Sequence, residues 1–412
     1  MKKVIIISPE FFPITNWGGI ATFYTSLVLH LLRLNKHVEV VTISYSLKNK
    51  KVFTINPRFT LVLLPYRTSF KLLNIVYFKL MHPFRAILST YFPESLQNFD
   101  WSLIFWSYLA KKNSNNIQSV HTSLYHSAGI ISSVLLKRIR FIFHIHGPLH
   151  IFLPYQRNSL DLRIAAALQL APLKNPRNLF IACGINFAKW FKKRYGVRKL
   201  DVIPNTLPKP NKSNGNSEIH TNLIVYWGQL EYRKGVDLLI DSFLLYKKRN
   251  PTTHLLLIGT MGTSFGDKHT KSLIDWMNDK KISRQTRKAI HIQPPIKTIA
   301  VLERVLKNDK VIAVFPSRIE PFGYSVLESL RSGHITITTN TWGGNELISH
   351  GQNGFICTAT CQSICTALQH ASSLPKSELE TVSKKAILSA KKYIFPSQNS
   401  KYKQKYEKLK NY

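Results

Sequence analysis

Short runs of aliphatic residues, apolar at nearly every position, alternate along this chain with amphipathic stretches of helical periodicity. Strands that are apolar on both faces are typical of a parallel sheet covered by helices on both sides. In the first half, the helices Ile20–Leu34 and Asn186–Tyr195 are expected between such strands. The predicted strands are Val4–Ser8, Val38–Ile43, Thr60–Leu64, Ser119–His121, Phe141–His146, Leu179–Ala182 and Asp201–Ile203. This pattern predicts an α/β fold with a doubly wound, Rossmann-like sheet.

The alternation stops at Pro204–Ser217, which contains three prolines and no large apolar cluster, and then it resumes. The later strands are predicted at Asn222–Trp227, His254–Ile258, Ala289–Ile292, Val311–Phe315 and Ile335–Thr339. The later helices are predicted at Val236–Arg249, His269–Lys281, Ile299–Lys307, Tyr324–Ser332, Cys361–Ser372, Lys376–Lys392 and Gln398–Leu409. A chain of 412 residues is long enough for two domains. We therefore expect one Rossmann-like domain over residues 1–204, a linker over 205–217, a second domain over 218–393, and a terminal helix over 394–412 that packs back on the first domain.

The chain is strongly basic, with 57 Lys and Arg against 21 Asp and Glu. Residues 1–204 hold 27 of these basic and 6 of these acidic residues, so the excess is not confined to a tail. Such a charge attracts nucleic acid, an anionic membrane or phosphorylated small molecules, although a biased base composition of the genome explains part of it. A nucleic-acid binder needs a basic stripe with interleaved aromatic residues or a known module. Neither is found, so no nucleic-acid partner is expected.

A membrane surface is a second possible partner. The segment Ser69–Leu88 mixes Lys71, Lys79 and Arg85 with aromatic and aliphatic residues. This composition suits a segment in a membrane interface and, equally, a helix packed in the core. No window offers the 18 or so continuous apolar residues of a transmembrane helix, and the run Val4–Ile7 is too short for a signal peptide. We expect a cytoplasmic protein that can bind the inner face of the cell membrane peripherally.

Two doubly wound domains predict a cleft facing the carboxyl ends of both sheets, where ligands bind. The first loop of this kind carries Gly18 and Gly19 between a strand and a helix. Paired glycines let the backbone approach a ligand and leave helix N–H groups facing an anion. A plain tight turn explains them equally well, and the absence of G-x-G-x-x-G argues against a dinucleotide site.

Histidines end the strand in FHIHGP, where alternation places His144 and His146 on one face. Histidine can donate hydrogen bonds to a phosphate or a sugar hydroxyl. A metal site that also includes His150 is disfavoured, because no carboxylate lies nearby in the sequence.

Of the four cysteines, Cys361 and Cys365 stand four residues apart in an expected helix, and Cys357 lies four residues before them. Three thiols on one helical face could bind a soft metal. Buried small hydrophobic side chains are the favoured interpretation, and free thiols suit a reducing cytoplasm.

The loop YWGQLEYRKGVDLL places Lys234 and Gly235 directly ahead of a helix. A lysine at this position combines its charge with the positive end of the helix dipole, which suits a phosphate. In so basic a chain, a surface lysine is the alternative.

The segment FPSRIEPFGYSVLESL gives the strongest signal, because Glu320 and Glu328 flank a Pro-Phe-Gly turn in a chain with few acids. The turn and the helix start offer free N–H groups for phosphate, and carboxylates can accept sugar hydroxyls. A solvated helix residue is the alternative for Glu328. A further permissive loop is expected at Gly343 and Gly344, just before Glu346.

Taken together in this order, Glu320…Glu328, GQLEYRKG, the early WGGI and the late GGNE resemble the retaining glycosyltransferases of family 4. The resemblance runs from about residue 4 to about residue 395. It implies a GT-B fold, a nucleotide-diphosphate sugar as donor, and no catalytic metal or other cofactor.

The resemblance also implies roles for individual residues. Glu328 would hold the donor ribose, Glu320 would contact the transferred sugar, and Lys234 would neutralise the pyrophosphate. The catalytic candidates are Glu320, Lys234 and His146, with His146 beside the sugar. The donor-binding candidates are Glu328, Arg233, Gln229, the backbone at Phe322, Gly323 and Tyr324, and the pair Gly18 and Gly19.

Two residues depart from the family pattern. Gln229 stands where the family usually has Arg, which weakens the phosphate clamp unless Arg233 substitutes for it. His334 stands in place of the usual Pro and is expected to affect only the turn.

The expected function is sugar transfer with retention from a UDP- or GDP-sugar to a glycan or lipid-linked glycan, in bacterial surface polysaccharide synthesis. Positive charge on the leaving phosphate would make Mg²⁺ dispensable, and that phosphate would take the acceptor's proton. A non-catalytic sugar-nucleotide-binding protein is the main alternative. A hydrolase or an epimerase on the same fold is a weaker one.

Overall fold

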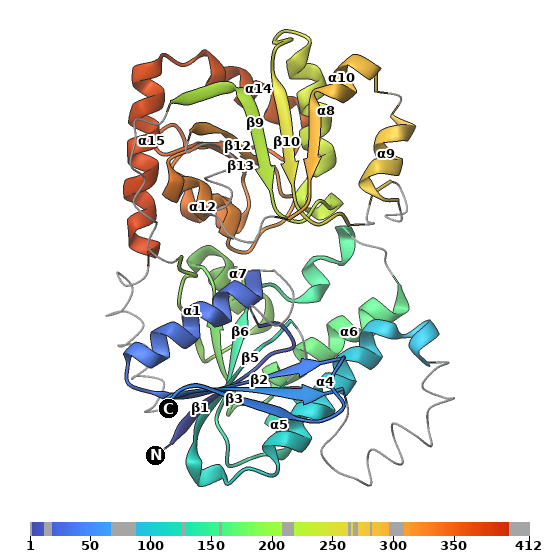
Figure 1. Ribbon diagram of the computed structural model, residues 1–412, viewed down its shortest axis with the longest axis vertical. Helices are drawn as coiled ribbons and strands as arrows, with labels where there is room; N and C mark the ends of the chain where they lie inside the picture. The colour runs from blue at the N-terminus through green and yellow to red at the C-terminus, as the bar shows by residue number, and fades with distance from the viewer. Residues whose placement is uncertain are drawn as a thin grey trace. The chain divides into compact units, whose positions relative to one another are not determined.

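The computed structural model describes residues 2–11, 19–66, 88–125, 129–155, 159–207, 218–262, 265–266, 271–280, 282–295 and 309–394. They form two compact units, the first within Met1–Leu153 and Asn158–Pro204 and the second within Asn205–Gln398 (Figure 1). Several predictions lie outside these residues. They are those on Gly18, on Ser69–Leu88 apart from its last residue, on linker residues 208–217, on the helix Ile299–Lys307, and on residues 395–412.

The first unit is built on an eight-stranded sheet with the order β3-β4-β2-β1-β5-β6-β7-β8. Its central strand is buried from Val4 to Ile7, since layers of helices cover both faces. Seven strands pair in parallel, as the sequence predicts. They are β1 Lys3–Ile7, β2 His37–Ser44, β4 Phe59–Pro65, β5 Ile117–Ser123, β6 Phe141–Ile145, β7 Leu179–Ala182 and β8 Leu200–Val202.

The eighth strand, β3 (Lys51–Asn56), was not predicted and corrects the expectation of a wholly parallel sheet. It pairs antiparallel with β4 at the edge, and all six of its residues are exposed. A strand without a buried face has no apolar pattern that a sequence can reveal. An antiparallel edge strand on an otherwise parallel sheet is a common arrangement.

The helices of the first unit include two that were predicted, α1 (Gly19–Arg33) and α7 (Ile185–Tyr195). Three others, α4 (Pro93–Leu109), α5 (Ile130–Leu135) and α6 (Leu160–Leu170), were not. The carboxylate of Asp161 joins α6 to α4, because it accepts hydrogen bonds from the N–H groups of Glu94 (2.7 Å) and Ser95 (2.9 Å). These donors lie in the first turn of α4, where no carbonyl of the helix itself can accept them.

The second unit has a six-stranded, wholly parallel sheet with the order β11-β10-β9-β12-β13-β14. The strands are β9 Ile219–Trp227, β10 His254–Ile258, β11 Ile290–Gln293, β12 Lys310–Phe315, β13 Ile335–Thr339 and β14 Phe355–Cys357. The described helices are α8 Val236–Lys247, α9 Leu273–Asp279, α10 Arg284–Lys288, α12 Tyr324–Ser332, α13 Trp342–Leu347, α14 Cys361–Ser373 and α15 Lys376–Ala390. The predicted fold class, two doubly wound α/β units, is confirmed.

Two local expectations were wrong in this unit. Gly343 and Gly344 lie inside α13 rather than in a loop. A Cβ at Gly343 would come within 2.0 Å of the Phe322 carbonyl oxygen, so close packing requires the glycine. Cys357 ends β14, whereas Cys361 and Cys365 lie in α14, so the three thiols do not share a helical face.

Each sheet has a point at which the chain stops adding strands on one side of its first strand and begins to add them on the other. In the first sheet this reversal point lies between β1 and β5, and in the second it lies between β9 and β12. Loops on either side of such a point diverge and leave a crevice at the carboxyl ends of the strands. The loops that follow β9 and β12 are therefore the places to look for a site in the second unit.

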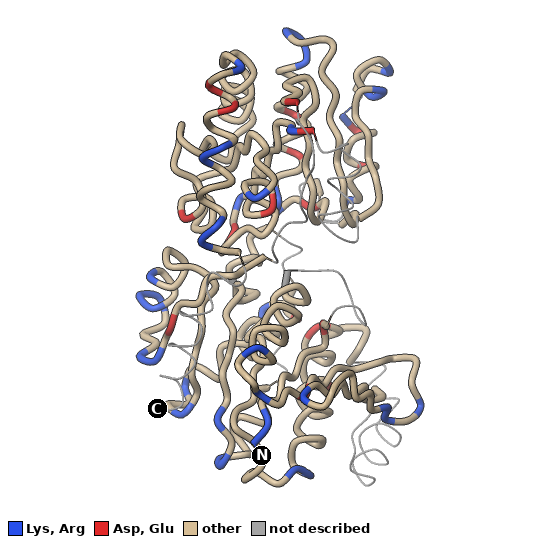
Figure 2. Tube along the Cα trace, turned by 60° about the vertical axis from the view of Figure 1, so that its left-hand side comes forward, with Lys and Arg blue, Asp and Glu red and all other residues tan. Residues whose placement is uncertain are grey.

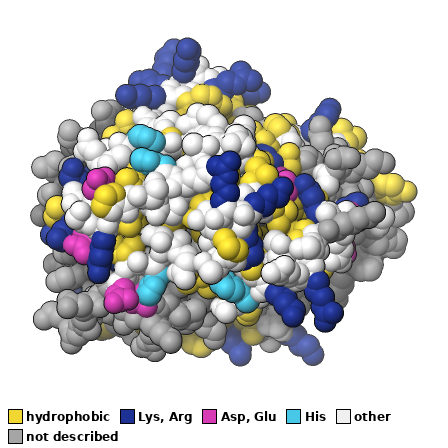
Figure 3. All heavy atoms as spheres, turned by 90° about the horizontal axis from the view of Figure 1, so that it is seen from above, with side chains coloured by type: hydrophobic (Ala, Val, Ile, Leu, Met, Phe, Trp, Pro, Cys, Tyr) yellow, Lys and Arg dark blue, Asp and Glu magenta, His cyan; other side chains and the backbone are white. Residues whose placement is uncertain are grey.

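Charge is distributed unevenly between the two units. Figure 2 shows Lys and Arg along both, whereas Asp and Glu are concentrated in the second. Basic side chains also project from several parts of the face in Figure 3. In the parts of the chain that are described, no helix is long and apolar enough to cross a membrane.

Candidate functional site

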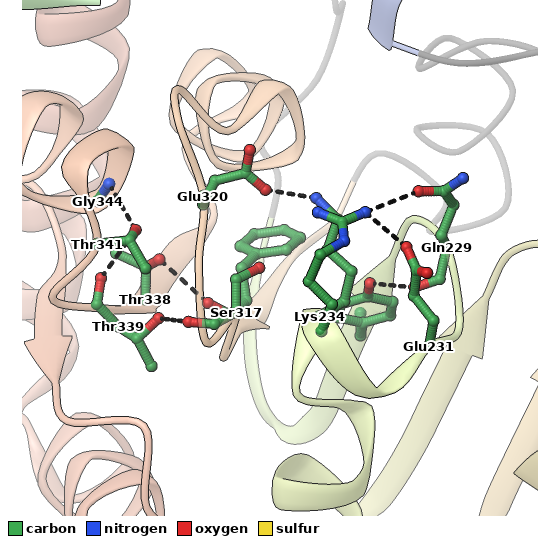
Figure 4. A network of polar contacts seen from close by, with 12 residues as sticks. Gln229, Glu231, Lys234, Ser317, Glu320, Thr338, Thr339, Thr341 and Gly344 are labelled. Atoms are coloured by element: carbon green, nitrogen blue, oxygen red, sulfur yellow. Dashed lines mark hydrogen bonds and ion pairs between the residues drawn. The ribbon is translucent and has the colours of Figure 1, made fainter. Parts of the chain in front are cut away.

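An ion pair joins the two loops that flank the reversal point of the second sheet. The Lys234 ammonium, from the loop after β9, donates to Glu320 Oε2, from the loop after β12 (Figure 4). The two side chains are 19% and 16% exposed, so both are largely shielded from water. The sequence predicted a role for each residue but gave no measure of their proximity.

The loop after β9 is held against the loop after β12 by close backbone packing. It forms a short 3-10 turn at Tyr232–Lys234, and Gly235 then has a φ of 70°. A Cβ at Gly235 would lie 1.9 Å from the Pro316 carbonyl oxygen. The Arg318 N–H also donates to the Arg233 carbonyl at 2.9 Å. Glycine is required at 235, and its position fixes Lys234 beside Glu320.

The Glu320 carboxyl is ionised in this environment. Burial alone would raise its pKa, but the charges of Lys234 and Arg233 outweigh burial and hold the pKa below its ordinary value. The backbone N–H of Phe322 also donates to this carboxylate. The Glu320 carbonyl oxygen accepts from the Gly343 N–H at 3.0 Å, which ties the loop to α13.

Arg233 lies beside the position where the family pattern departs. Its Nη2 donates to Glu231 Oε1 at 2.6 Å and to Gln229 Oε1 at 3.2 Å. The lowering of the Glu320 pKa shows that the Arg233 charge is felt at the ion pair. The guanidinium therefore adds positive charge to the neighbourhood of Gln229.

A second arginine braces the same loops, and the sequence gave no signal for it. Arg318 donates to both oxygens of Asp237, at 2.7 and 2.6 Å, and its guanidinium lies 3.6 Å from the centre of the Tyr232 ring. Two parallel hydrogen bonds between planar groups fix orientation as well as distance. Arg318 thereby holds the start of α8 against the loop that carries Glu320.

Hydroxyl groups secure the end of β12 next to this loop (Figure 4). Thr338 Oγ1 donates to the Phe315 carbonyl at 3.1 Å, and Thr339 Oγ1 donates to the Ser317 carbonyl. Thr341 caps α13 by accepting from the Gly344 N–H at 3.1 Å. These bonds satisfy backbone groups where the ladder ends, which leaves the segment between Ser317 and Glu320 well fixed.

Glu328, the second acidic candidate, lies within α12. Its Oε2 accepts from the indole N–H of Trp227 at 2.8 Å, so it is not simply a solvated helix residue. The helix begins at Tyr324 after Gly323, which has a φ of 90°. The first turn of an α-helix presents N–H groups that the carbonyls of the helix itself do not accept, and such groups can bind an anion.

His334 does more than shape the turn, contrary to the expectation from the sequence. Its Nδ1 accepts from the Val311 N–H at 3.3 Å, and its ring packs edge-on against Trp227. Burial lowers its pKa to about 4, so the imidazole is neutral near pH 7.

In the first unit, histidines line the carboxyl half of the sheet. His144 is buried in β6 and hydrogen-bonds with His121 of β5 at 2.9 Å, while His146 is half-buried just after the strand. Phe23 of α1 packs against the rings of His144 and His146, at centroid distances of 4.7 and 4.5 Å. Burial lowers the pKa of His121 to about 3 and that of His144 well below the ordinary value.

The structure thus gathers most of the predicted site residues in the second unit. Lys234, Glu320 and Arg233 form one charged cluster with Gln229. Phe322, Gly323 and Tyr324 lead into the helix that carries Glu328. His146 and Gly19, the first residue of α1, belong to the first unit. Among the described residues, no group of three or more His, Cys, Asp or Glu side chains is placed to hold a metal ion.

Comparisons with known proteins cover both units. The family model described as Glycosyltransferase Family 4 matches residues 17–208, and the model described as Glycosyl transferases group 1 matches residues 209–387. A stretch of 134 residues, 32% of this chain, is 33% identical to a glycogen synthase of Mycobacterium tuberculosis and spans 30% of it. Another stretch of 173 residues, 40% of this chain, is 22% identical to an uncharacterized glycosyltransferase of Bacillus subtilis and spans 42% of it.

Solved structures extend the likeness over the whole fold. A sucrose-phosphate synthase of Thermosynechococcus elongatus has a TM-score of 0.72 at 15% identity, with 99% of each chain covered. HepE of Anabaena, solved in complex with UDP and glucose, has a TM-score of 0.65 at 15% identity, again with 99% of each chain covered. At such identities the structures show the fold alone. The chain belongs to the family 4 glycosyltransferases, and its two parallel-sheet units have the GT-B fold.

Proposed function

We propose that the protein is a retaining glycosyltransferase that moves a sugar from a UDP- or GDP-sugar to a glycan or lipid-linked glycan without a metal ion. One observation carries the proposal. The Lys234–Glu320 pair lies at the point where the second sheet reverses, beside the helix start that leads to Glu328. Cationic groups, a helix N-terminus and carboxylates would thereby serve one ligand that has both a diphosphate and sugar hydroxyls.

The diphosphate is the part of the donor that needs positive charge. Lys234 supplies an ammonium group, Arg233 adds a guanidinium, and the start of α12 adds backbone N–H groups. Together these groups would stabilise the charge that develops on the leaving phosphate, which is the role that a metal ion plays in other enzymes.

The carboxylates suit the two sugars of the donor. Glu320 is held ionised next to the cations and would accept hydroxyls of the transferred sugar. Glu328, inside α12, would accept hydroxyls of the ribose. His146 of the first unit, which the family resemblance puts beside the transferred sugar, would donate a hydrogen bond to it.

The proposed step breaks the bond between the anomeric carbon and the β-phosphate oxygen, and the nucleoside diphosphate leaves with the electron pair. The acceptor hydroxyl forms the new bond on the same face through an oxocarbenium-like state. Its proton passes to the leaving phosphate oxygen. The configuration at the anomeric carbon is therefore retained.

A thermal-shift screen against UDP-, GDP- and ADP-sugars tests donor binding, because a ligand of the folded state raises the melting temperature. The best ligand is then used in a transfer assay with and without EDTA. We expect equal turnover in both conditions, and a loss of turnover in EDTA would contradict metal independence. Binding without transfer or hydrolysis for any acceptor would instead identify the non-catalytic alternative.

The departure at Gln229 gives a sharper test of the diphosphate site. Gln229→Arg would restore the family's usual side chain next to Arg233 and Glu231. We expect tighter binding of UDP or GDP, by about threefold to tenfold, because one more cation faces the diphosphate. An unchanged or weaker affinity would show that Arg233 already fills this role or that the diphosphate lies elsewhere.

We also propose that the protein acts in the cytoplasm and binds the anionic inner face of the membrane, in keeping with a role in surface polysaccharide synthesis. The net charge of +36 supports this, as does an apolar stripe on α6. Leu160, Ile164 and Leu168, spaced four residues apart, are 64%, 37% and 38% exposed. Flotation with liposomes that contain anionic lipid at low salt should recover the protein. If the protein is absent from the liposome fraction, the proposal of membrane binding is refuted.

A further inference from the structure

The indole of Trp227, at the end of a strand, is buried and packs against two other aromatic rings. It is 8% exposed at the carboxyl end of β9. Its ring meets that of Phe315, at the end of β12, at a centroid distance of 4.7 Å and an angle of 88°. The ring of His334 lies on it at 5.9 Å and 71°. Packing against these two rings restricts the orientation of the indole N–H.

That N–H points at the carboxylate of Glu328, the proposed ligand of the donor ribose. It donates to Glu328 Oε2 at 2.8 Å, across 101 residues of sequence. Trp227 and Glu328 lie on opposite sides of the reversal point of the second sheet, one at the end of β9 and the other in the helix after β12. A hydrogen bond to an ionised acceptor is stronger than one between neutral groups and restricts the acceptor's orientation.

His334 supports the indole without competing for the carboxylate. It is 2% exposed and its Nδ1 accepts from the Val311 N–H, so the ring is held in one tautomer. Being neutral near pH 7, it offers the carboxylate no alternative cation. The Pro that the family usually has at this position carries no aromatic ring. A chain with Pro here would therefore lack this contact with the indole of Trp227.

We propose that Trp227, braced by His334, is a positioning residue that orients the Glu328 carboxylate toward the hydroxyls of the donor ribose and so sets the preference for ribose over deoxyribose. The proposal rests on the proposed function, because only there is Glu328 a ligand of the ribose. Trp227 acts through Glu328 and does not itself touch the sugar.

The test compares the affinities of UDP and GDP with those of their 2′-deoxy forms, for the wild type and Trp227→Phe. We expect the wild type to prefer the ribose form by about tenfold and the variant by about threefold or less. Binding of the 2′-deoxy nucleotides should weaken less than binding of the ribonucleotides, because the deoxyribose keeps only the 3′-hydroxyl for Glu328. In turnover, the KM for the donor should rise while kcat at saturating donor stays close to that of the wild type.

Trp190→Phe in α7 of the first unit is the matched control and should keep the wild-type preference. If Trp227→Phe does not fold, benzothienyl-alanine at position 227 replaces the N–H by sulfur and keeps the ring shape. A Trp227 variant that discriminates ribose as well as the wild type would overturn this inference alone. A wild type that binds none of these nucleotides would overturn the proposed function as well.

Discussion

Among the described residues, the buried groups at the carboxyl ends of the two sheets differ in their chemistry. In the second unit, the loops there hold three ion pairs, Lys234–Glu320, Arg233–Glu231 and Arg318–Asp237. In the first unit, the buried groups at the corresponding end include His121 and His144, both neutral because burial lowers their pKa. Under the proposed function, the second unit would bind the diphosphate, and the family resemblance assigns His146 of the first unit to the hydroxyls of the transferred sugar.

The largest effect is expected from a substitution that removes the ammonium charge of Lys234 in the second unit. Lys234→Ala should lower kcat/KM by about 10³-fold, because the leaving diphosphate loses its ammonium partner. Steady-state kinetics with the best donor measure this. Lys280→Ala is the control, since Lys280 pairs with Asp241 outside the two loops. Near-normal turnover of Lys234→Ala would refute the role assigned to Lys234.

The second-largest effect distinguishes the role of Glu320 from that of Lys234, its partner in the ion pair. Glu320→Gln should lower kcat/KM by about 10²-fold, because the carboxylate that would hold the transferred sugar is lost. Its affinity for UDP or GDP should not fall, since removing a negative charge beside the diphosphate cannot weaken anion binding. Isothermal titration measures the affinity, with Glu378→Gln in α15 as the control. An equal loss of nucleotide affinity would place Glu320 on the nucleotide instead.

The third effect comes from the neutral histidines and concerns stability. His121 has a pKa of about 3 in the folded chain and about 6.5 when unfolded, so the unfolded state binds more protons as the pH falls. Stability from this group is complete above pH 6.5 and declines as the pH falls toward 3. At pH 5 the loss is about 2 kcal/mol of unfolding free energy.

Urea denaturation of the wild type at pH 7 and pH 5 measures this loss, and His121→Asn should show a smaller one. His334, with a pKa of about 4, contributes with the same sign from the second unit. Equal losses in the variant and the wild type would show that His121 is not the group responsible.

The smallest effect tests the uncharged chemistry of the first unit. His146→Ala should lower kcat by about tenfold, as expected for the loss of one hydrogen bond to the sugar in the transition state. The dissociation constant for UDP or GDP should stay unchanged, because the nucleotide contacts would lie in the second unit. His254→Ala is the control, at an exposed position in β10. A weaker nucleotide affinity in His146→Ala would break the division between the units.

The sequence was most accurate where strands and helices follow simple patterns of burial. The predicted limits of β7, β10, β13 and α12 agree with the structure residue for residue. All residues of β7 and β13 are buried. The run LFIA of β7 is continuously apolar, whereas ITITT of β13 is a run of β-branched residues, and both patterns favour a strand without knowledge of its neighbours.

The sequence analysis missed helices whose buried faces mix polar with apolar side chains. The buried face of α4 includes Ser95, Asn98 and Asp100, and that of α6 includes Ala165 and Gln169. Ser95, Asp100 and Gln169 find hydrogen-bond partners within the fold, as Asp161 does with the start of α4. Such compensation depends on tertiary contacts, so periodicity alone does not reveal it.

Taken alone, the sequence determined the architecture and the identity of the chemical groups. Continuous apolar runs required two parallel sheets, and the positions of Lys234, Glu320 and Glu328 after strands placed them at carboxyl ends. Only the tertiary structure decided their partners. Lys234 meets Glu320 across 86 residues and Trp227 meets Glu328 across 101, because β9 and β12 lie next to one another in the sheet. Strand order is a property of the folded chain, and no local pattern encodes it.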